Sequence, residues 1–345
     1  MVVINSSSLV GKDFTQVDLK NSRIFLFGNF PSYTQNKKPN TLNIVGDVEM
    51  SDLGRIDGRT NLFGLIATPI GHSLAPAMHN MSFRKMGLNC AYMAFEVGND
   101  QLEDVITGMR ALKLRGFNVS MPNKTKILPL LDEITPAAQF MGAVNTVINE
   151  NGKLIGHNTD GIGYMRSLTE AGVDFVGKKM TLMGAGGAAT AVAVQGALDG
   201  IAEISLFNRN ISPSSRAIKI SEIINKQTNC RVNVYSIEDL DKLKEEIAVS
   251  DILTNTTGVG MKPFEGQSLI PDSSWLRSEL VVSDAIYNPR KTKLLEQAES
   301  VGCKVINGLG MMLWAGAQSF EIWTGLKMPV EYVKEQLFQD AVQSL

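Results

Sequence analysis

Two charged residues, Lys124 and Asp160, have the types and surroundings needed to move a proton to or from a substrate oxygen. Lys124 ends the segment at 118–124 (NVSMPNK), where we expect a helix to begin. The helix dipole disfavours a lysine at that place, which favours a role as a donor to a ligand, although a surface lysine is the commoner case. Asp160 opens the helix predicted after the strand-like residues 154–155, and N-capping is its structural alternative.

Further polar segments accompany these two residues. They are residues 69–80 (PIGHSLAPAMHN), 142–146 (GAVNT) and 156–161 (GHNTDG), and each falls where a predicted strand ends or a helix begins. In open α/β sheets ligands bind at the carboxyl ends of the strands. We therefore expect these segments to line one site.

A glycine-rich turn at residues 184–189 (GAGGAA) fits the pattern G-x-G-x-x-A between a predicted strand and a predicted helix. Gly184 permits the tight turn, Gly186 lets the backbone approach a pyrophosphate, and the helix N-terminus offers free N–H groups to phosphate. So short a match also fits a turn selected for packing. The order strand, turn, helix and strand favours a dinucleotide site.

The segment after the next strand bears on the choice between NAD and NADP. An NAD site usually has an acidic residue roughly 20 residues after the glycine turn, to bind the ribose 2′-hydroxyl. Residues 207–212 (FNRNIS) contain no carboxylate, and Arg209 and Arg216 are the cations of this region. Arginine suits a 2′-phosphate, but solvated surface arginines would give the same sequence. NAD and NADP therefore both remain open.

The elements that must position these residues alternate between strand and helix, which predicts an α/β fold. In the first half we expect a largely parallel sheet. Its strands are predicted at 62–67, 91–97 and 116–119, with helices at 76–86, 101–112 and 122–131. In the second half the order is typical of a doubly wound Rossmann domain. Its strands are predicted at 180–183, 204–207, 232–235, 252–255, 280–283 and 304–306, with an alanine-rich helix at 188–198.

The chain divides into four segments by composition and pattern. Residues 1–59 are rich in Asn, Ser, Lys and Asp, and we expect a polar extension that is partly ordered at best, with one strand-like patch at 23–27. We expect a substrate-binding and catalytic domain at 60–160, a Rossmann domain at 161–309, and C-terminal helices at 310–345 that return to the first domain.

Charge and composition exclude several classes of protein. The net charge is −2 and the pI is near 6.0, so no basic field points to nucleic acid or to anionic lipid. No secretory signal or run of 18 apolar residues is present, so we expect neither export nor a membrane span. Three widely spaced cysteines fit reduced thiols in the cytoplasm, and three histidines without metal-ligand spacing predict no metal. A homodimer is compatible with the sequence, which leaves the oligomeric state open.

The polar segments and the glycine turn together resemble the shikimate dehydrogenase family, most closely its shikimate/quinate dehydrogenase branch. The matching motifs stand in the family's order: PIGHS, NVSMPNK, GAVNT, NTDG, GAGGA, YNP and FEIWTG. The resemblance runs from about residue 61 to about residue 332. It implies an N-terminal substrate domain, a Rossmann domain and C-terminal helices that return to the first domain.

The resemblance also assigns roles by position. It implies that Lys124 and Asp160 are catalytic and that a hydroxy acid is bound by Ser73, Ser120, Asn145 and Tyr287. It implies that NAD or NADP is bound by Gly184, Ala185, Gly186, Gly187, Ala188, Asn208, Arg209, Asn210, Ile211, Ala285, Ile286, Asn288 and Gly308.

The implied activity is reversible NAD(P)-dependent oxidation of a ring hydroxyl of shikimate or quinate to the 3-dehydro ketone, in the chorismate pathway of aromatic amino acid biosynthesis. Such a reaction transfers hydride to nicotinamide and removes the hydroxyl proton. A lysine can take that proton when its pKa lies near neutrality, whereas a neighbouring carboxylate raises a lysine pKa. The sequence leaves open whether the pair exchanges the proton or mainly polarises the carbonyl.

Two positions depart from the family pattern. Ala75 stands where the family has a serine, and Ala315 stands where it has a glutamine; both family residues contact the substrate carboxylate. Two lost polar partners would weaken productive binding by roughly 10²- to 10⁴-fold, unless water or neighbouring side chains replace them. Two alternatives follow: a divergent paralogue that prefers another hydroxy acid, and a non-catalytic dinucleotide sensor. The intact Lys124–Asp160 pair argues against the sensor.

Overall fold

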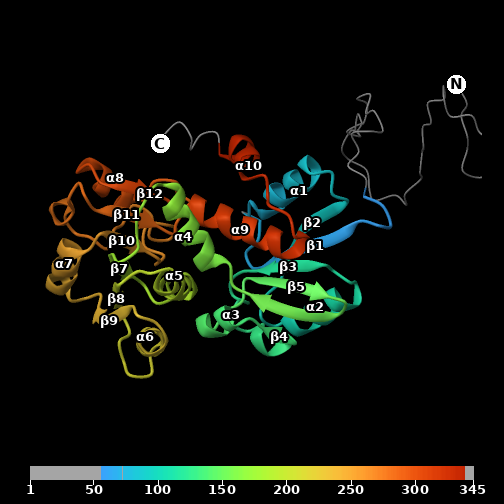
Figure 1. The fold of residues 1–345 in the computed structure, drawn as a ribbon, viewed down its shortest axis with the longest axis horizontal. Coiled ribbons are helices and arrows are strands. Elements are labelled where there is room, and N and C mark those ends of the chain that lie inside the picture. Colours follow the sequence, from blue (N-terminus) through green and yellow to red (C-terminus); the bar gives the residue numbers. More distant parts are fainter. Residues whose placement is uncertain (1–55, 72, 339–345) are drawn as a thin grey trace, which may run out of the picture. The chain divides into compact units, whose positions relative to one another are not determined.

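The computed structural model of the chain describes residues 56–71 and 73–338 (Figure 1). The strand predicted at 23–27 and most of the extension predicted at 1–59 lie outside the described residues, as does His72. Over the described residues the fold is α/β, as the sequence predicts, and it contains two six-stranded sheets. No described helix is long and apolar enough to cross a membrane.

The first sheet is mixed and has the strand order β2-β1-β3-β5-β6-β4. Its strands are β1 (Asn61–Ala67), β2 (Cys90–Glu96), β3 (Gly116–Val119), β4 (Glu133–Ile134), β5 (Thr146–Glu150) and β6 (Lys153–His157). β1 is parallel to β2 and β3, whereas β5 is antiparallel to β3 and β6. The antiparallel pair arises because Asn151 and Gly152, both with positive φ, form a tight turn between β5 and β6.

The described residues of this first half form three α-helices: α1 (Ala75–Lys85), α2 (Leu102–Ala111) and α3 (Pro136–Met141). The helix predicted at 122–131 is wrong. This stretch consists of turns followed by a short 3-10 helix, η3 (Leu128–Leu130). Pro129 has no N–H to donate within a helix, which explains the failure. Lys124 therefore lies in a turn, and the argument from a helix dipole does not apply to it.

The second sheet is parallel throughout, with the order β12-β11-β10-β7-β8-β9. Its strands are β7 (Lys179–Met183), β8 (Glu203–Asn208), β9 (Arg231–Ser236), β10 (Ile252–Asn255), β11 (Val281–Asp284) and β12 (Lys304–Ile306). Counted from β7, this is the strand order 3-2-1-4-5-6 of a doubly wound Rossmann sheet. The predicted strands of this half are confirmed to within one residue at each end.

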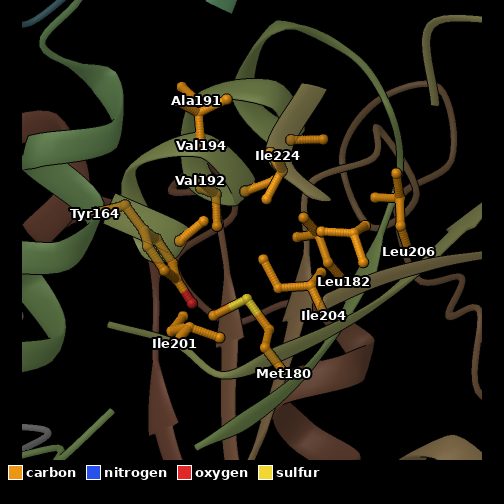
Figure 2. Packing of buried hydrophobic residues seen from close by; sticks show 14 of the residues in the cluster. Tyr164, Met180, Leu182, Ala191, Val192, Val194, Ile201, Ile204, Leu206 and Ile224 are labelled. Atoms are coloured by element: carbon orange, nitrogen blue, oxygen red, sulfur yellow. The ribbon is translucent and has the colours of Figure 1, made fainter. Parts of the chain in front are cut away.

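Helices cover this sheet and enclose an apolar core. They include α5 (Gly187–Leu198), α6 (Arg216–Gln227), α7 (Leu240–Val249) and α8 (Lys293–Ser300), and a short 3-10 helix, η4 (Ser273–Trp275), follows β10. Figure 2 shows Val192 and Val194 of α5 in the same cluster as Met180, Leu182 and Ile204 of the strands. Each fully buried side chain of this size contributes about 1.5–3 kcal/mol to stability. This core fixes the end of β7, where the glycine-rich turn begins.

The helices α4 (Asp160–Glu170) and α9 (Gly308–Thr324) run close together. A Cβ at Gly163 would lie 2.5 Å from the carbonyl oxygen of Met311, so the glycine permits this approach. α9 also packs its Leu313 and Phe320 in one cluster with residues of β1 and α1, and α10 (Val330–Leu337) joins the same cluster. α9 begins directly after β12 and reaches the first sheet, so it joins the second half of the fold to the first (Figure 1).

Candidate active site

One cavity of about 290 Å³ brings the predicted catalytic and substrate residues together. Its walls include Ser73, Ser120, Lys124, Asn145, Asp160 and Tyr287. Residues of the second half, Ala188, Ala285 and Gly308, line the same cavity. Ala75 and Ala315, the two departures from the family pattern, also line it. The cavity therefore lies where the first sheet, the glycine-rich turn and α9 meet.

Lys124 and Asp160 form an ion pair inside this cavity. Lys124 Nζ lies 2.5 Å from Asp160 Oδ2, and the two side chains are 18% and 14% exposed. Asp160 is the first residue of α4, and the N-cap is Thr159, without a side-chain cap hydrogen bond. The N-capping alternative for Asp160 is therefore wrong. The carboxylate instead binds the lysine that sequence reasoning paired with it.

Asn145 binds the other oxygen of the same carboxylate. Its Nδ2 donates to Asp160 Oδ1 at 2.7 Å and to Thr159 Oγ1 at 2.9 Å. Its Oδ1 accepts from the backbone N–H of Thr159 at 2.8 Å. Both Nδ2 hydrogens are thus used within the protein, so the geometry favours a role in orienting Asp160.

A buried polar network that sequence reasoning missed lies behind Asn145. Ser319 Oγ of α9 lies 2.7 Å from Thr146 Oγ1 and accepts from Asn118 Nδ2 at 3.0 Å. The hydroxyl of Tyr92 donates to Asn118 Oδ1 at 2.7 Å. The network ties α9 to β3 and β5 beside the ion pair. Its signal in the sequence is the helical spacing of Ser319 from Ala315 and Met312, which share one face of α9.

The glycine-rich turn has the geometry that a pyrophosphate requires. Gly184 has φ +111°, and a Cβ there would lie 2.9 Å from Thr256 Oγ1. Gly186 is the N-cap of α5 with no side-chain cap hydrogen bond, and a Cβ at Gly186 or Gly187 would meet open space. A glycine N-cap has no side chain that could bind the first N–H groups of α5, and these residues fit a dinucleotide phosphate. Ala188, in the first turn of α5, reaches the cavity.

The predicted adenosine-ribose segment begins at Asn208, the last residue of β8, and β8 pairs with β7, the strand that leads into the glycine turn. Asn208 Nδ2 donates to the carbonyl of Asn210 at 2.9 Å, which shapes the loop, and Ile211 is 43% exposed. Arg209 is exposed. Arg216, by contrast, is half-buried and donates to the carbonyl of Met141 at 3.2 Å. Arg209 is therefore the better placed of the two arginines for a 2′-phosphate.

The predicted nicotinamide side joins the loop after β11 to the start of α9. A Cβ at Gly308 would lie 2.1 Å from the carbonyl oxygen of Ala285, so only glycine permits this contact. Ile286 is buried and Asn288 is exposed, and neither belongs to the cavity wall among the described residues. Burial raises the pKa of Tyr287, which keeps its hydroxyl protonated at neutral pH.

Asp284, the last residue of β11, stabilises this loop by hydrogen bonds. It accepts hydrogen bonds from the Ile286 N–H at 3.0 Å, from Asn255 Nδ2 at 3.1 Å and from Thr292 Oγ1 at 2.8 Å. Burial is the larger influence and raises the pKa of Asp284 to about 6. The carboxylate is a structural support and lies outside the cavity wall.

Comparison with known proteins agrees with this site. The family model of the shikimate dehydrogenase substrate binding domain matches residues 65–147, and that of the shikimate 5′-dehydrogenase C-terminal domain matches residues 308–338. A shikimate dehydrogenase (NADP(+)) of Listeria innocua is 60% identical over 284 residues, which are 82% of this chain and 98% of the relative. One of Streptococcus uberis is 53% identical and covers 83% and 98% of the two chains.

Solved structures give the same result for the fold. Shikimate 5-dehydrogenase from Listeria monocytogenes, in complex with shikimate and NAD, matches with a TM-score of 0.79 and 60% identity over 82% of this chain and 98% of that chain. Quinate dehydrogenase from Corynebacterium glutamicum, in complex with NAD, matches with a TM-score of 0.73 and 28% identity over 83% and 99%. The chain belongs to the shikimate dehydrogenase family, and its Rossmann half and substrate half are those of an NAD(P)-dependent oxidoreductase that acts on CH–OH groups.

Proposed function

We propose that this chain catalyses the reversible NAD(P)-dependent oxidation of a ring hydroxyl of shikimate, or of quinate, to the 3-dehydro ketone. The observation that carries the proposal is the Lys124–Asp160 pair, 2.5 Å apart, in the cavity that Ala188 and Gly308 of the dinucleotide-binding half also line. The named activity of the relatives at 60% identity supports it. Aromatic amino acid biosynthesis is the corresponding metabolic setting.

In the proposed mechanism the ion pair holds the reacting hydroxyl. The bound dinucleotide supplies the hydride acceptor at its nicotinamide ring. Lys124 Nζ can donate to the substrate oxygen and Asp160 can accept from a substrate hydroxyl, because each presents atoms beyond those used in their mutual contact. As the ketone forms, the proton of the reacting hydroxyl passes to Lys124 Nζ in its unprotonated form, beside Asp160, and the resulting ammonium returns it in the reverse direction. Ser73, Ser120 and Tyr287 offer hydroxyls to the rest of the ring.

We assign the remaining predicted roles by position. Residues 184–188 would hold the pyrophosphate at the start of α5, and Ala285 with Gly308 would flank the nicotinamide. Arg209 would bind the 2′-phosphate, so we propose NADP as the preferred cofactor, in keeping with the NADP(+) named for the relatives. Asn145 would act on the substrate through Asp160.

The domain division and the location are parts of the same proposal. We assign residues 60–160 to the substrate domain, 161–309 to the Rossmann domain and 310–345 to C-terminal helices, with 1–59 as an extension outside the catalytic unit. We assign the enzyme to the cytoplasm, because its cysteines are free thiols, as is usual in a reducing compartment. The divergent paralogue and the dinucleotide sensor are not favoured, since the relatives with high identity carry the dehydrogenase name.

The test is to follow the absorbance of the reduced nicotinamide with shikimate and quinate, each with NADP⁺ and with NAD⁺. The proposal expects turnover of shikimate and a higher kcat/KM with NADP⁺. Absence of turnover with all four combinations, in folded protein that binds dinucleotide, would contradict it and favour a sensor.

A further inference from the structure

One wall of the cavity is apolar, and it lies on α1 and α9. From α1, Ala75, Met78 and His79 line the cavity at the spacing i, i+3, i+4 and so share one helix face. The lining residues of α9 follow the same spacing: Gly308, Met311, Met312, Ala315, Gly316 and Ser319. The two helices touch here, because a Cβ at Gly316 would lie 2.2 Å from Met78 Cε. We call Ala75, Met78, Met312, Ala315 and Gly316 the α1–α9 wall.

This wall offers no charge to a ligand. Among the described residues that line the cavity, Lys124 and Asp160 are the charged ones, and they are paired with each other. His79 is fully buried, and burial lowers its pKa to about 3, so it is neutral. A carboxylate placed against the α1–α9 wall would therefore find no unpaired cation among these residues. Burying a charge without a charged or fully hydrogen-bonded partner is costly.

Ser73 and Tyr287 can offer hydroxyl groups to a substituent that lies against this wall. Ser73 Oγ accepts from the Ala75 N–H at 3.3 Å, which leaves its own hydrogen to donate. Burial raises the pKa of Tyr287, so its hydroxyl stays neutral. Such neutral donors can also bind the carbonyl of an amide or ester. They bind a carboxylate oxygen more strongly, but the carboxylate loses more hydration when it enters the cavity, and the two effects oppose each other.

The same wall can change shape to fit a larger substituent. Met78 and Met312 are unbranched side chains with several rotatable bonds, and thioethers adapt to irregular contacts. Ala75 and Ala315 contribute one methyl group each. An added methyl or amide hydrogen on the substrate therefore meets small or adaptable groups.

We propose that the α1–α9 wall does not select for an acidic substituent, and that the enzyme oxidises neutral amide or ester derivatives of its cyclic hydroxy acid as substrates alongside the acid. The inference rests on the proposed function, because it concerns the end of the same substrate that faces away from Lys124 and Asp160. It extends the substrate class from cyclic hydroxy acids to their uncharged derivatives.

The experiment compares three substrates on the full-length parent enzyme: shikimate, its primary amide and its methyl ester, each with saturating NADP⁺. The amide matches the acid in size, and the ester adds one methyl group. The inference expects kcat/KM for the amide within tenfold of that for the acid.

The outcomes separate this inference from the proposed function. Oxidation of the acid with a loss of more than tenfold for the amide would overturn the inference and leave the proposed function standing. Failure to oxidise the acid and both derivatives would overturn the proposed function, and the inference with it.

A pair of variants tests the location of the effect. Ala315→Lys adds a cation to the wall, and Ala315→Met adds a side chain of similar length without charge. We expect the lysine to raise the ratio of kcat/KM for acid over amide at least tenfold, and the methionine to leave that ratio within threefold. Ala75→Lys and Ala75→Met repeat the comparison from α1 if the first pair does not fold. An unchanged ratio in a folded lysine variant would contradict the placement of this substituent at the wall.

Discussion

Asn145 Nδ2 donates a 2.7 Å hydrogen bond to Asp160 Oδ1, while Lys124 binds the other oxygen of the same carboxylate. The carboxylate is therefore held from two sides, by the residue that precedes β5 and by a turn residue. The backbone reinforces this arrangement, because the Val144 N–H donates to the carbonyl of Lys124 at 2.9 Å. Asn145 thus acts as a positioning residue for the ion pair.

Replacing this amide should impair the chemical step more than binding. Asn145→Ala removes a hydrogen bond to a charged group, which is equivalent to about 1–3 kcal/mol, so we expect kcat to fall roughly tenfold to hundredfold. KM for shikimate should change less. Asn149→Ala is the matched control, since Asn149 is a nearby buried amide, within β5, that accepts from the Gly152 N–H instead. A rise in KM with unchanged kcat would instead indicate direct substrate binding by Asn145.

The glycine turn can be tested without disturbing the fold. A Cβ at Gly186 meets nothing within 4 Å, and its φ of −76° suits any residue. Gly186→Val should therefore leave the thermal midpoint nearly unchanged but abolish dinucleotide binding, because the branched side chain occupies the path of the pyrophosphate. Titration calorimetry with NADP⁺ measures the affinity, with Gly108→Val, an equally open site in α2, as control. Unchanged affinity would remove the turn from the cofactor site.

The choice of cofactor should depend on Arg209 and not on Arg216. Arg209→Ala is expected to raise KM for NADP⁺ about tenfold or more while KM for NAD⁺ stays within twofold, because only NADP⁺ carries the 2′-phosphate. Arg216→Ala should leave the NADP⁺ to NAD⁺ ratio unchanged, since its guanidinium bonds the Met141 carbonyl. Equal effects of Arg209→Ala on both cofactors would contradict the assignment.

Asp284 should make stability fall as the pH rises. Its pKa is near 3.8 in the unfolded chain and is raised to about 6 in the native protein by burial. The native state therefore holds the proton more tightly, and this contribution is complete below about pH 4 and lost as the pH passes 6. Between pH 4 and pH 7 the parent should therefore lose roughly 2–3 kcal/mol more of its unfolding free energy than Asp284→Asn loses.

Urea denaturation at pH 4 and pH 7 measures this difference. Asp241→Asn is the control, because Asp241 is exposed in the first turn of α7. An Asp284→Asn protein with the same pH dependence as the parent would show that Asp284 does not carry the effect.

The parallel Rossmann strands were predictable because each is a short apolar run bounded by turn residues; β10 and β12 occur as predicted. The glycine turn was also predictable, because neighbouring residues in the sequence determine its conformation. The helix predicted at 122–131 was wrong because the prediction relied on the spacing of apolar residues and did not weigh Pro129, which interrupts an α-helix. The hairpin of β5 and β6 was missed although its Asn151-Gly152 pair is a strong turn signal.

In the candidate site, too, local motifs were predictable and long-range contacts were not. The motif residues, Lys124 and Asp160 among them, do meet in one cavity. The contact of Ser319 with Thr146 was not predictable, because 173 positions separate the two hydroxyls and only the packing of α9 joins them. The use of Asn145 to hold Asp160, and of Arg216 to hold Met141, likewise depends on distances that a sequence does not contain.

The central claim is that Lys124, paired with Asp160, acts on the oxygen of the reacting hydroxyl, and one steady-state measurement tests it most directly. The kcat of Lys124→Ala is determined with shikimate and NADP⁺, with Lys126→Ala, an exposed lysine two residues away, as control. We predict that kcat of Lys124→Ala falls at least a hundredfold while the dissociation constant for NADP⁺ stays within twofold and the control keeps full activity. A folded Lys124→Ala enzyme that retains more than a tenth of the parent kcat would contradict the account.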